Sequence, residues 1–383
     1  MELTDLSDPP ADLTGLREKV SGIRKELSQA THMPGELYTS DTVFAREKER
    51  IFMKQWLCIA RLEEFPNPGD YITRKIAGES IIVTRQGDGG VSAFLNMCLH
   101  RGVEVAYGDG NTNRFKCPYH AWSYDIGGKL LGAPLRGHGE QLTVDRLPPL
   151  RTATWRGWVF VNFDQDAELF RSWIAPFEDK LGFYRTGECR MAARVVVEVP
   201  CNWKFVAENL IDWYHAMTLH AETIGKYYRL DSKTFPAELL PKGGSVVRFD
   251  SSTRLSDPNF PFPKLPWLDP DGVFSAKAVM FPNLNLSAGS DSLRMWHLWP
   301  LTTTTMQAVY YILLPESSFS VPDFDAKLAQ YVNYIKSVVA EDRIALESLQ
   351  RAVVSPHFVP GRLAPLEVEI HHLLRHYVEA MAF

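Results

Sequence analysis

The sequence predicts an α+β protein with two domains, a small antiparallel β domain followed by a larger antiparallel sheet flanked by helices. Three observations support this fold class. The chain has 383 residues, which is more than one small domain needs. Short strand-like segments gather in two separate regions of the sequence. The long helical patterns do not alternate with these strands, which disfavours a parallel sheet.

The N-terminal region is predicted to be helical. Residues 11–31 carry apolar side chains at helical spacing, namely Leu13, Leu16, Val20, Ile23 and Leu27. A second helix is expected to begin at Ser40 or Asp41, either of which can cap it, and to continue to Gln55. We therefore expect residues 1–45 to form a helical segment that packs on the larger domain.

Residues 46–165 are predicted to form the small β domain. Residues 71–76, 80–86 and 91–96 have the composition of strands, and the glycine-rich residues 87–90 supply a tight turn between the last two. Sequence rich in glycine, proline and aromatic residues continues to a last strand-like segment at 158–163. This pattern is typical of a compact antiparallel sheet.

Residues 166–383 are predicted to form the larger domain. Its strand-like segments are residues 194–199, 245–250, 274–281, 284–289, 293–300 and 306–315. Its helical segments are residues 203–220, 324–353 and 366–381. Because most of these strands follow one another directly along the chain, an antiparallel sheet with helices beside it is the expected arrangement.

Composition excludes several classes of function. The 41 basic and 46 acidic side chains give a net charge of −5, so a broad nucleic-acid-binding face is not expected. No apolar run approaches the ~20 residues that span a bilayer, and the first thirty residues lack the pattern of a secretory signal. Five cysteines are too few for a disulfide scaffold. We expect a cytoplasmic protein that binds neither nucleic acid nor membrane.

Two cysteines and two histidines in the small domain form the first candidate metal site. Cys98 and His100 follow one strand-like segment, and Cys117 and His120 follow the next. Such a set can hold a structural zinc ion. Zinc modules usually take both cysteines from one turn and both histidines from a helix, whereas here each loop supplies one of each. That pairing favours a [2Fe-2S] cluster in which one iron takes the sulfurs and the other the nitrogens.

The helix predicted at 203–220 carries the second candidate site. Asp212 and His215 lie three residues apart, so a helix presents them on one face. His215 and His220 lie five apart, which turns a regular helix by about 140°. Both histidines can reach one metal ion only if the helix ends or bulges between them. The alternative for a single histidine here is an ordinary core residue, but two of them near Asp212 and Asn209 favour a metal site.

Asp342 is the candidate third ligand. It lies on the apolar stripe of the helix predicted at 324–353, which is formed by Val332, Ile335, Val339, Leu346 and Leu349. A carboxylate on a buried face is costly unless it is paired or bound to metal, and a buried Asp–Arg pair is the alternative. Glu341 and Glu347 are expected to be solvated. Two imidazoles and one carboxylate form the open facial triad of non-haem Fe(II) oxygenases.

The two motifs together resemble those of a known family. The segments CLHRG, at 98–102, and CPYHAWSYD, at 117–125, are similar to the paired loops of the Rieske iron–sulfur domain. The spacing N-x-x-D-x-x-H-x-x-x-x-H from Asn209, followed by Glu-Asp at 341–342, resembles the catalytic domain of Rieske non-haem iron oxygenases. Ala121 stands where that family usually has glycine. The resemblance covers nearly the whole chain and implies the terminal oxygenase (alpha) subunit.

The resemblance implies cofactors and partners. Residues 46–165 would be the Rieske [2Fe-2S] domain and residues 166–383 the domain of a mononuclear Fe(II). Electrons would come from NADH or NADPH through a flavin reductase, with or without a ferredoxin. The family forms rings of three chains, so a homotrimer is implied, and a small beta subunit is possible. Electrons would cross between chains, with Asp212 linking His215 to the partner subunit's His120 and orienting both rings.

The resemblance also implies the reaction. The protein would use O2 to hydroxylate, dihydroxylate or demethylate a small aromatic or methylated substrate, as a monooxygenase or a dioxygenase. Residues near the ligands and on the strands expected to face inward are candidates for the substrate pocket: Asn209, Leu210, Met217, Phe281, Asn283, Leu286, Met295, His297 and Trp299. The alternative is a non-enzymatic electron carrier or a zinc-stabilised binding protein.

Overall fold

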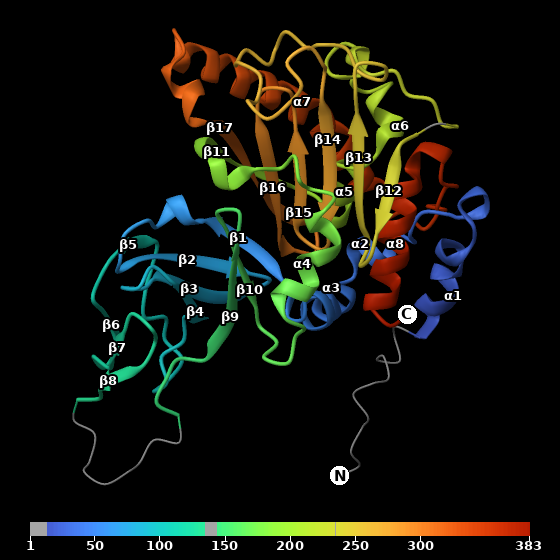
Figure 1. Ribbon diagram of the computed structural model, residues 1–383. Helices are drawn as coiled ribbons and strands as arrows, with labels where there is room; N and C mark the ends of the chain where they lie inside the picture. Colours follow the sequence, from blue (N-terminus) through green and yellow to red (C-terminus); the bar gives the residue numbers. More distant parts are fainter. Residues whose placement is uncertain (1–13, 135–143, 234) are drawn as a thin grey trace. The chain divides into compact units, whose positions relative to one another are not determined.

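The computed structural model describes residues 14–134, 144–233 and 235–383 and divides into two compact units (Figure 1). The small unit comprises residues 52–175 and 186–190. The large unit takes the described residues up to 51 together with 176–185 and 191–383. The domain boundaries predicted after 45 and 165 lie six and ten residues before those of the units, which fall after 51 and 175. Within the described residues, no helix has both the length and the apolar character to cross a membrane.

The small unit is built on antiparallel sheets. A seven-stranded sheet has the order β1-β10-β9-β4-β3-β2-β5, and a three-stranded sheet has the order β6-β7-β8. The bounds are β1 (Leu57–Arg61), β2 (Asp70–Ile76), β3 (Glu79–Arg85), β4 (Val91–Leu95), β5 (Asp109–Asn111), β6 (Arg114–Lys116), β7 (Ser123–Asp125), β8 (Leu130–Gly132), β9 (Pro149–Trp155) and β10 (Trp158–Asn162). Its core includes Phe94, Phe115 and Tyr124 together with Cys98 and Cys117.

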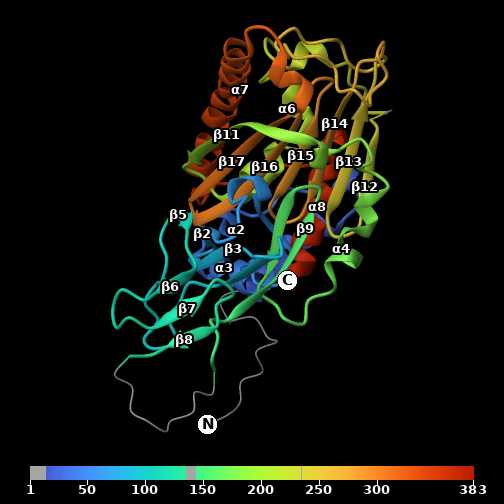
Figure 2. The same cartoon turned by 60° about the vertical axis from the view of Figure 1, so that its left-hand side comes forward.

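The large unit is a seven-stranded antiparallel sheet with helices packed on one face (Figure 2). Its strand order is β11-β17-β16-β15-β14-β13-β12. The strands are β11 (Cys189–Val199), β12 (Ala237–Leu240), β13 (Gly244–Phe249), β14 (Ser275–Met280), β15 (Leu284–Ala288), β16 (Leu293–Thr302) and β17 (Thr305–Pro315). The principal helices are α5 (Trp203–Asn209), α6 (Trp213–Ala216), α7 (Phe324–Ala352) and α8 (Val368–Ala380). The predicted α+β fold class is confirmed.

Strand register assigns side chains to the two faces of the large sheet. Side chains alternate between faces along a strand, and directly paired residues share a face. Lys277, Ser287, Arg294, Trp296 and Tyr310 all lie on one face by this rule. Helix α7 packs against the same face, where its Val332 and Ile335 join a cluster with Tyr310. The candidate site therefore lies between this face and the helical layer.

The N-terminal segment differs from the single helix predicted over 11–31. Residues 11–13, with Leu13, lie outside the described residues; helix α1 covers Thr14–Lys19 and a 3-10 turn covers Val20–Arg24. Glycine at positions 15 and 22 weakens helix formation. Ser40 does cap α3 (Asp41–Glu47), accepting a hydrogen bond from Val43 N at 3.3 Å. A π turn from Lys48 to Phe52 then ends the helix before Gln55.

A buried carboxylate holds α5, the helix that precedes the candidate site. Glu47 of α3 accepts hydrogen bonds from Trp203 Nε1 at 2.8 Å, from Lys204 Nζ at 2.5 Å and from Tyr377 of α8 at 2.6 Å. A buried charge is tolerated when it is paired and hydrogen-bonded in this way. Asn202 caps the start of α5, and its amide also donates to the Thr303 carbonyl at 2.8 Å. Helix α5 is thus fixed to α3, α8 and the sheet.

Candidate metal centres and active-site cavity

Two loops of the small unit bring Cys98, His100, Cys117 and His120 to one end of its sheets. Cys98 follows β4, and its carbonyl oxygen accepts from Gly102 N at 2.9 Å. Cys117 directly follows β6, and its carbonyl oxygen accepts from Ala121 N at 3.0 Å. Ala121 has φ 58°, a left-handed conformation that favours glycine, which gives a physical reason for glycine being usual at this position. Each loop is therefore a tight turn around its cysteine.

The four side chains differ in exposure. The thiols of Cys98 and Cys117 are buried, whereas the rings of His100 and His120 are exposed, with 3.1 Å between their Nδ1 atoms. The hydroxyl of Tyr124 lies 3.1 Å from Cys98 Sγ, and Trp122 stacks on His100 with ring centroids 5.1 Å apart. The sulfur side of the site faces the core and the imidazole side faces outward.

The spacing of these donors fits a two-iron cluster better than one zinc ion. A tetrahedral zinc ion with bonds of about 2.0–2.3 Å needs all its ligand atoms within about 4 Å of one another. Among the described residues, the group whose ligand atoms all lie within 4.8 Å is His215, His220 and Asp342, and the cysteine–histidine set forms no such group. Two thiols and two imidazoles spread more widely are the donor set of a Rieske-type cluster.

The second candidate site is formed where α6 ends. Asp212 is the N-cap of α6, and its Oδ1 accepts from Tyr214 N at 2.8 Å and from His215 N at 3.2 Å. The helix ends at Ala216, between His215 and His220, as two ligands five residues apart require. After His220 the chain turns back and passes close to the end of α6. A Cβ atom at position 225 would lie only 2.2 Å from the Ala216 carbonyl oxygen. Glycine at 225 therefore allows the turn that places His220.

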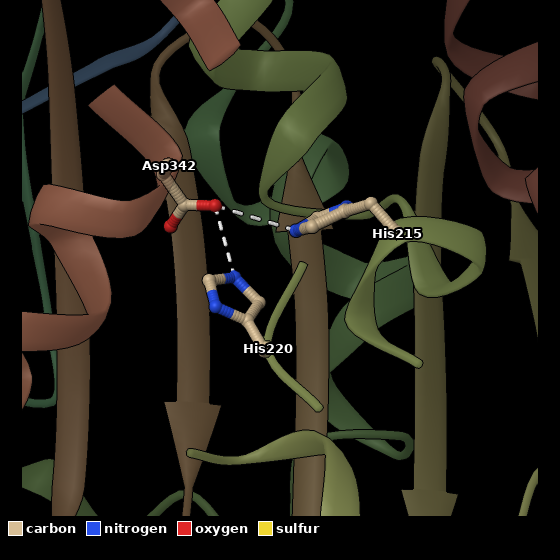
Figure 3. A group of neighbouring side chains, drawn as sticks. All are labelled: His215, His220 and Asp342. Atoms are coloured by element: carbon tan, nitrogen blue, oxygen red, sulfur yellow. Dashed lines mark hydrogen bonds and ion pairs between the residues drawn. The ribbon is translucent and has the colours of Figure 1, made fainter. Parts of the chain in front are cut away.

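One carboxylate oxygen of Asp342, on α7, faces both imidazoles (Figure 3). Asp342 Oδ1 lies 2.9 Å from His220 Nε2 and 3.4 Å from His215 Nε2. Asn209 Nδ2 donates to the same oxygen at 3.0 Å. The partners of Asp342 are therefore the two histidines and Asn209, and the alternative of a buried Asp–Arg pair is not what the structure shows. The donor set and its convergence fit a single Fe(II).

The charges of this site are coupled. Burial would raise the pKa of Asp342, but hydrogen bonds from His215 and His220 outweigh burial and hold that pKa well below its ordinary value. Burial would lower the pKa of His215, but Asp212 and Asp342 raise it to about 9. Asp212 Oδ2 lies 3.0 Å from His215 Nδ1. A cation that binds here must therefore displace a proton from His215, and its affinity should fall as the pH falls.

Glu341 is a site residue that the sequence interpretation missed. It was expected to be solvated, but its Oε2 lies 2.6 Å from His220 Nδ1 and accepts from Thr223 Oγ1 at 2.8 Å. Adjacent helix positions are only about 100° apart, so Glu341 and Asp342 approach the two nitrogens of the same ring. The adjacent Glu-Asp pair in the sequence was the signal that could have indicated this role.

A cavity of about 110 Å³ adjoins the three side chains. Asn209 and Leu210 line it, as predicted from sequence. The other seven predicted pocket residues are not among its lining residues: Met217, Phe281, Asn283, Leu286, Met295, His297 and Trp299. On β16 the pairing places Arg294 and Trp296 on the cavity face, so Met295, His297 and Trp299 point the other way. Leu286, Met295, His297 and Trp299 therefore belong to the opposite face of the sheet, whereas Met217, Phe281 and Asn283 lie outside its strands.

Known proteins resemble the chain over most of its length. Residues 55–148 match the family model of the Rieske [2Fe-2S] domain, and residues 186–382 match that of the ring hydroxylating alpha subunit (catalytic domain). The carnitine monooxygenase oxygenase subunit of Acinetobacter pittii is 30% identical over 332 residues, covering 84% of this chain and 85% of that one. The benzene 1,2-dioxygenase subunit alpha of Pseudomonas putida is 29% identical over 308 residues, covering 70% and 68%.

A solved structure shows the same architecture. It is that of a quaternary ammonium Rieske monooxygenase, described in relation to carnitine oxidation and inter-subunit electron transfer. The two structures match with a TM-score of 0.76 at 26% sequence identity, covering 91% of this chain and 95% of the other. The solved structure therefore has the same fold as this chain, and the family models place a Rieske domain before a catalytic domain along this chain.

Proposed function

Because the chain belongs to the Rieske oxygenases, with a Rieske [2Fe-2S] domain and the catalytic domain of a ring-hydroxylating alpha subunit, we propose that it is an NAD(P)H-dependent terminal oxygenase. It would use electrons delivered by a reductase, with or without a ferredoxin, to oxygenate a small organic molecule with O2. The observation that carries this proposal is the convergence of His215, His220 and Asp342 beside a cavity. An electron carrier would not need this second site.

Each donor set has a distinct part in the proposal. His215, His220 and Asp342 would hold a mononuclear Fe(II), which supplies the activation of dioxygen when it is bound. The two cysteines and two histidines of the small unit would hold the cluster. Asn209 orients the Asp342 carboxylate, and Glu341 fixes which nitrogen of His220 carries the proton. The cavity positions the substrate next to these side chains and excludes bulk water.

Asp212 is proposed to connect the two kinds of centre between chains. Asp212 Oδ2 lies 3.0 Å from His215 Nδ1, and 20% of the Asp212 side chain is exposed. The exposed ring of His120 is available to a neighbouring copy of the chain. We propose a homotrimer in which Asp212 approaches the partner subunit's His120, orienting both imidazoles for electron transfer. The relative described with inter-subunit electron transfer supports this arrangement.

Anaerobically purified protein is expected to contain three iron atoms and two inorganic sulfides per chain. Two of the iron atoms belong to the cluster and one to the triad. Iron and sulfide analysis, with paramagnetic resonance of the dithionite-reduced protein, checks this result. A signal of a histidine-ligated cluster with one further ferrous iron supports the oxygenase. Zinc in place of iron, with no visible absorption, would favour the zinc-stabilised binding protein, and a cluster without the further iron would favour the carrier.

Replacing Glu341 by glutamine is expected to weaken binding of the mononuclear iron by about 10-fold, the lower range for loss of a partner behind a metal ligand. The reason is that His220 loses the carboxylate that orients its ring. Iron retained against a graded chelator measures the effect. Glu347→Gln is the matched control on the same helix, because Glu347 pairs with Arg343 and does not touch the triad. Equal iron retention in both variants would contradict the positioning role.

A further inference from the structure

The cavity beside the triad is lined by three cationic side chains. Lys277 lies on β14, Arg294 on β16, and Arg254 on the segment that follows β13. Arg254 is 5% exposed and Arg294 is 7% exposed. Burying a cation is costly unless it is paired with an opposite charge, so three cations around one small cavity require an explanation.

Carboxylates of the described residues act on two of these cations from a distance, Asp342 and Glu369 on Lys277 and Asp291 on Arg294, without forming an ion pair with them. Among the described residues, none of the three has a carboxylate oxygen within 4.0 Å of its charged nitrogens. Arg254 Nη1 and Arg294 Nε are buried without a hydrogen-bond partner. Lys277 Nζ donates only to the Leu210 carbonyl oxygen, at 3.1 Å, and burial lowers its pKa. Arg294 Nη1 is held by the Tyr331 hydroxyl at 3.1 Å, which leaves Lys277 and Arg254 as the less constrained pair.

Three aromatic rings of the cavity, those of Trp213, Tyr228 and Phe260, already pack against these cations. Lys277 Nζ lies 4.9 Å from the Trp213 ring, and Arg254 lies 4.3 Å from the Tyr228 ring. Arg294 lies 5.0 Å from the Phe260 ring. A quaternary ammonium group is recognised by free aromatic faces, and here those faces are taken by the protein's own cations, which would also repel it. The cavity is therefore unsuited to a substrate cation.

An apolar wall completes the cavity. Trp296 and Tyr310 lie with ring centroids 4.3 Å apart, and Ile335, Val338 and Val339 of α7 lie along the same cavity. Asp342 follows these residues on the same helix. An apolar group placed against this wall would lie beside the triad, while an acidic group could reach the cations.

We propose that the substrate is a small organic acid whose carboxylate is bound by Lys277 and Arg254 and whose apolar body lies against Trp296, Tyr310 and α7. An arginine and a lysine together bind a carboxylate by charge-assisted hydrogen bonds. This inference rests on the proposed oxygenase function and specifies its substrate class. It differs from what the carnitine monooxygenase relative would suggest in the body of the substrate, which is apolar instead of a trimethylammonium cation, because the faces of Trp213, Tyr228 and Phe260 are taken by the protein's own cations.

The inference is tested by binding of benzoate, benzamide, choline and L-carnitine to the iron-loaded protein under anaerobic conditions, followed by calorimetry. Benzoate is expected to bind more tightly than the other three compounds. Benzamide has the shape of benzoate but no charge, and choline and L-carnitine carry a trimethylammonium group that the cations of the cavity repel. Lys277→Met and Arg254→Met should each weaken benzoate binding by about 10-fold or more, as loss of a charged hydrogen bond predicts. Benzamide binding should change little in both variants. Lys226→Met, at an exposed lysine outside the cavity, is the control.

Two outcomes would overturn the inference. One is tighter binding of choline or L-carnitine than of benzoate to the unmodified protein; the other is unchanged benzoate affinity in both cavity variants. The unfolding temperature of each variant shows whether it is folded. Lys277→Met should unfold at the same or a higher temperature than the unmodified protein, because the substitution removes a buried charge that has no ion-pair partner. Metal analysis of the same samples separates the two proposals, since absence of the mononuclear iron contradicts the oxygenase, whereas either of these two outcomes in protein that holds the iron contradicts only the acid substrate.

Discussion

Replacing Asp342 by alanine is expected to remove the mononuclear iron and abolish oxygenation while leaving the [2Fe-2S] cluster intact. Asp342 supplies the only carboxylate of the triad, and its Oδ1 faces both imidazoles. The loss in activity should exceed the roughly 100-fold upper range for loss of a partner behind a metal ligand, because a ligand itself is removed. Iron content should fall from three atoms to two per chain, with an unchanged resonance signal from the reduced cluster.

The control for this variant is Asp325→Ala, at an exposed aspartate in the first turn of the same helix. It removes the same charge from α7 without touching the triad, so iron content and activity should be unchanged. Full retention of the third iron atom in the Asp342 variant would show that this carboxylate is not a ligand, and the assignment of the site would be wrong.

Replacing Asp212 by asparagine is expected to leave both metal centres occupied and to slow electron transfer between them by more than about 10-fold. The carbonyl oxygen of asparagine can still cap α6, so the fold of this segment should persist. The negative charge beside His215 Nδ1 is lost, and with it the proposed link between imidazoles of two chains. The rate at which the pre-reduced cluster is oxidised after mixing with O2 and substrate measures the effect.

Asp212→Ala extends this test, because alanine removes the cap as well as the charge. Loss of a cap costs about 1 kcal/mol, so this variant should unfold at a slightly lower temperature. Both variants should show the same slow electron transfer if the charge is what matters. Loss of the mononuclear iron from the asparagine variant beyond the roughly 10–100-fold weaker binding that follows from losing a partner behind a ligand would instead identify Asp212 as a ligand and contradict the proposed link.

The candidate metal ligands could be predicted from sequence because their signals are local. The cysteine and histidine pairs occupy two short loops, and Asp212, His215 and His220 lie within one segment. Asp342 is distant in sequence, but it was found as a carboxylate on the apolar stripe of a long helix, where an unpaired charge is costly. For Asp342, helical periodicity and the free-energy cost of burying a charge were sufficient to single out the residue as a candidate ligand.

The residues of the cavity could not be predicted because the large sheet is buried on both faces. Strands β15 and β16 have almost no exposed side chains to distinguish the cavity face from the other. A shift by one residue then exchanges the two faces, so Met295 and His297 were chosen where Arg294 and Trp296 line the cavity. Lys277 and Arg254 gave no motif, and only tertiary structure brings them to the triad.

Glu341 and the N-terminal helix show the limits of periodicity. The helical pattern placed Glu341 beside the apolar stripe, but the turn that carries His220 packs there and supplies a partner. At the N-terminus the apolar spacing continued past Lys19, where the α-helix ends and a 3-10 turn containing Gly22 begins. Both differences arise from contacts or backbone preferences that an apolar pattern does not record.

Helix α7 carries Asp342 and also forms one wall of the cavity through Ile335, Val338 and Val339. Enlarging the cavity from this side would therefore disturb iron retention, because a side chain that shifts the helix also shifts the ligand. The opposite wall, on β16 and β17, carries no ligand. Directed evolution toward bulkier compounds should consequently find its tolerated changes at Trp296 and Tyr310, and natural variation in substrate range should concentrate on those strands.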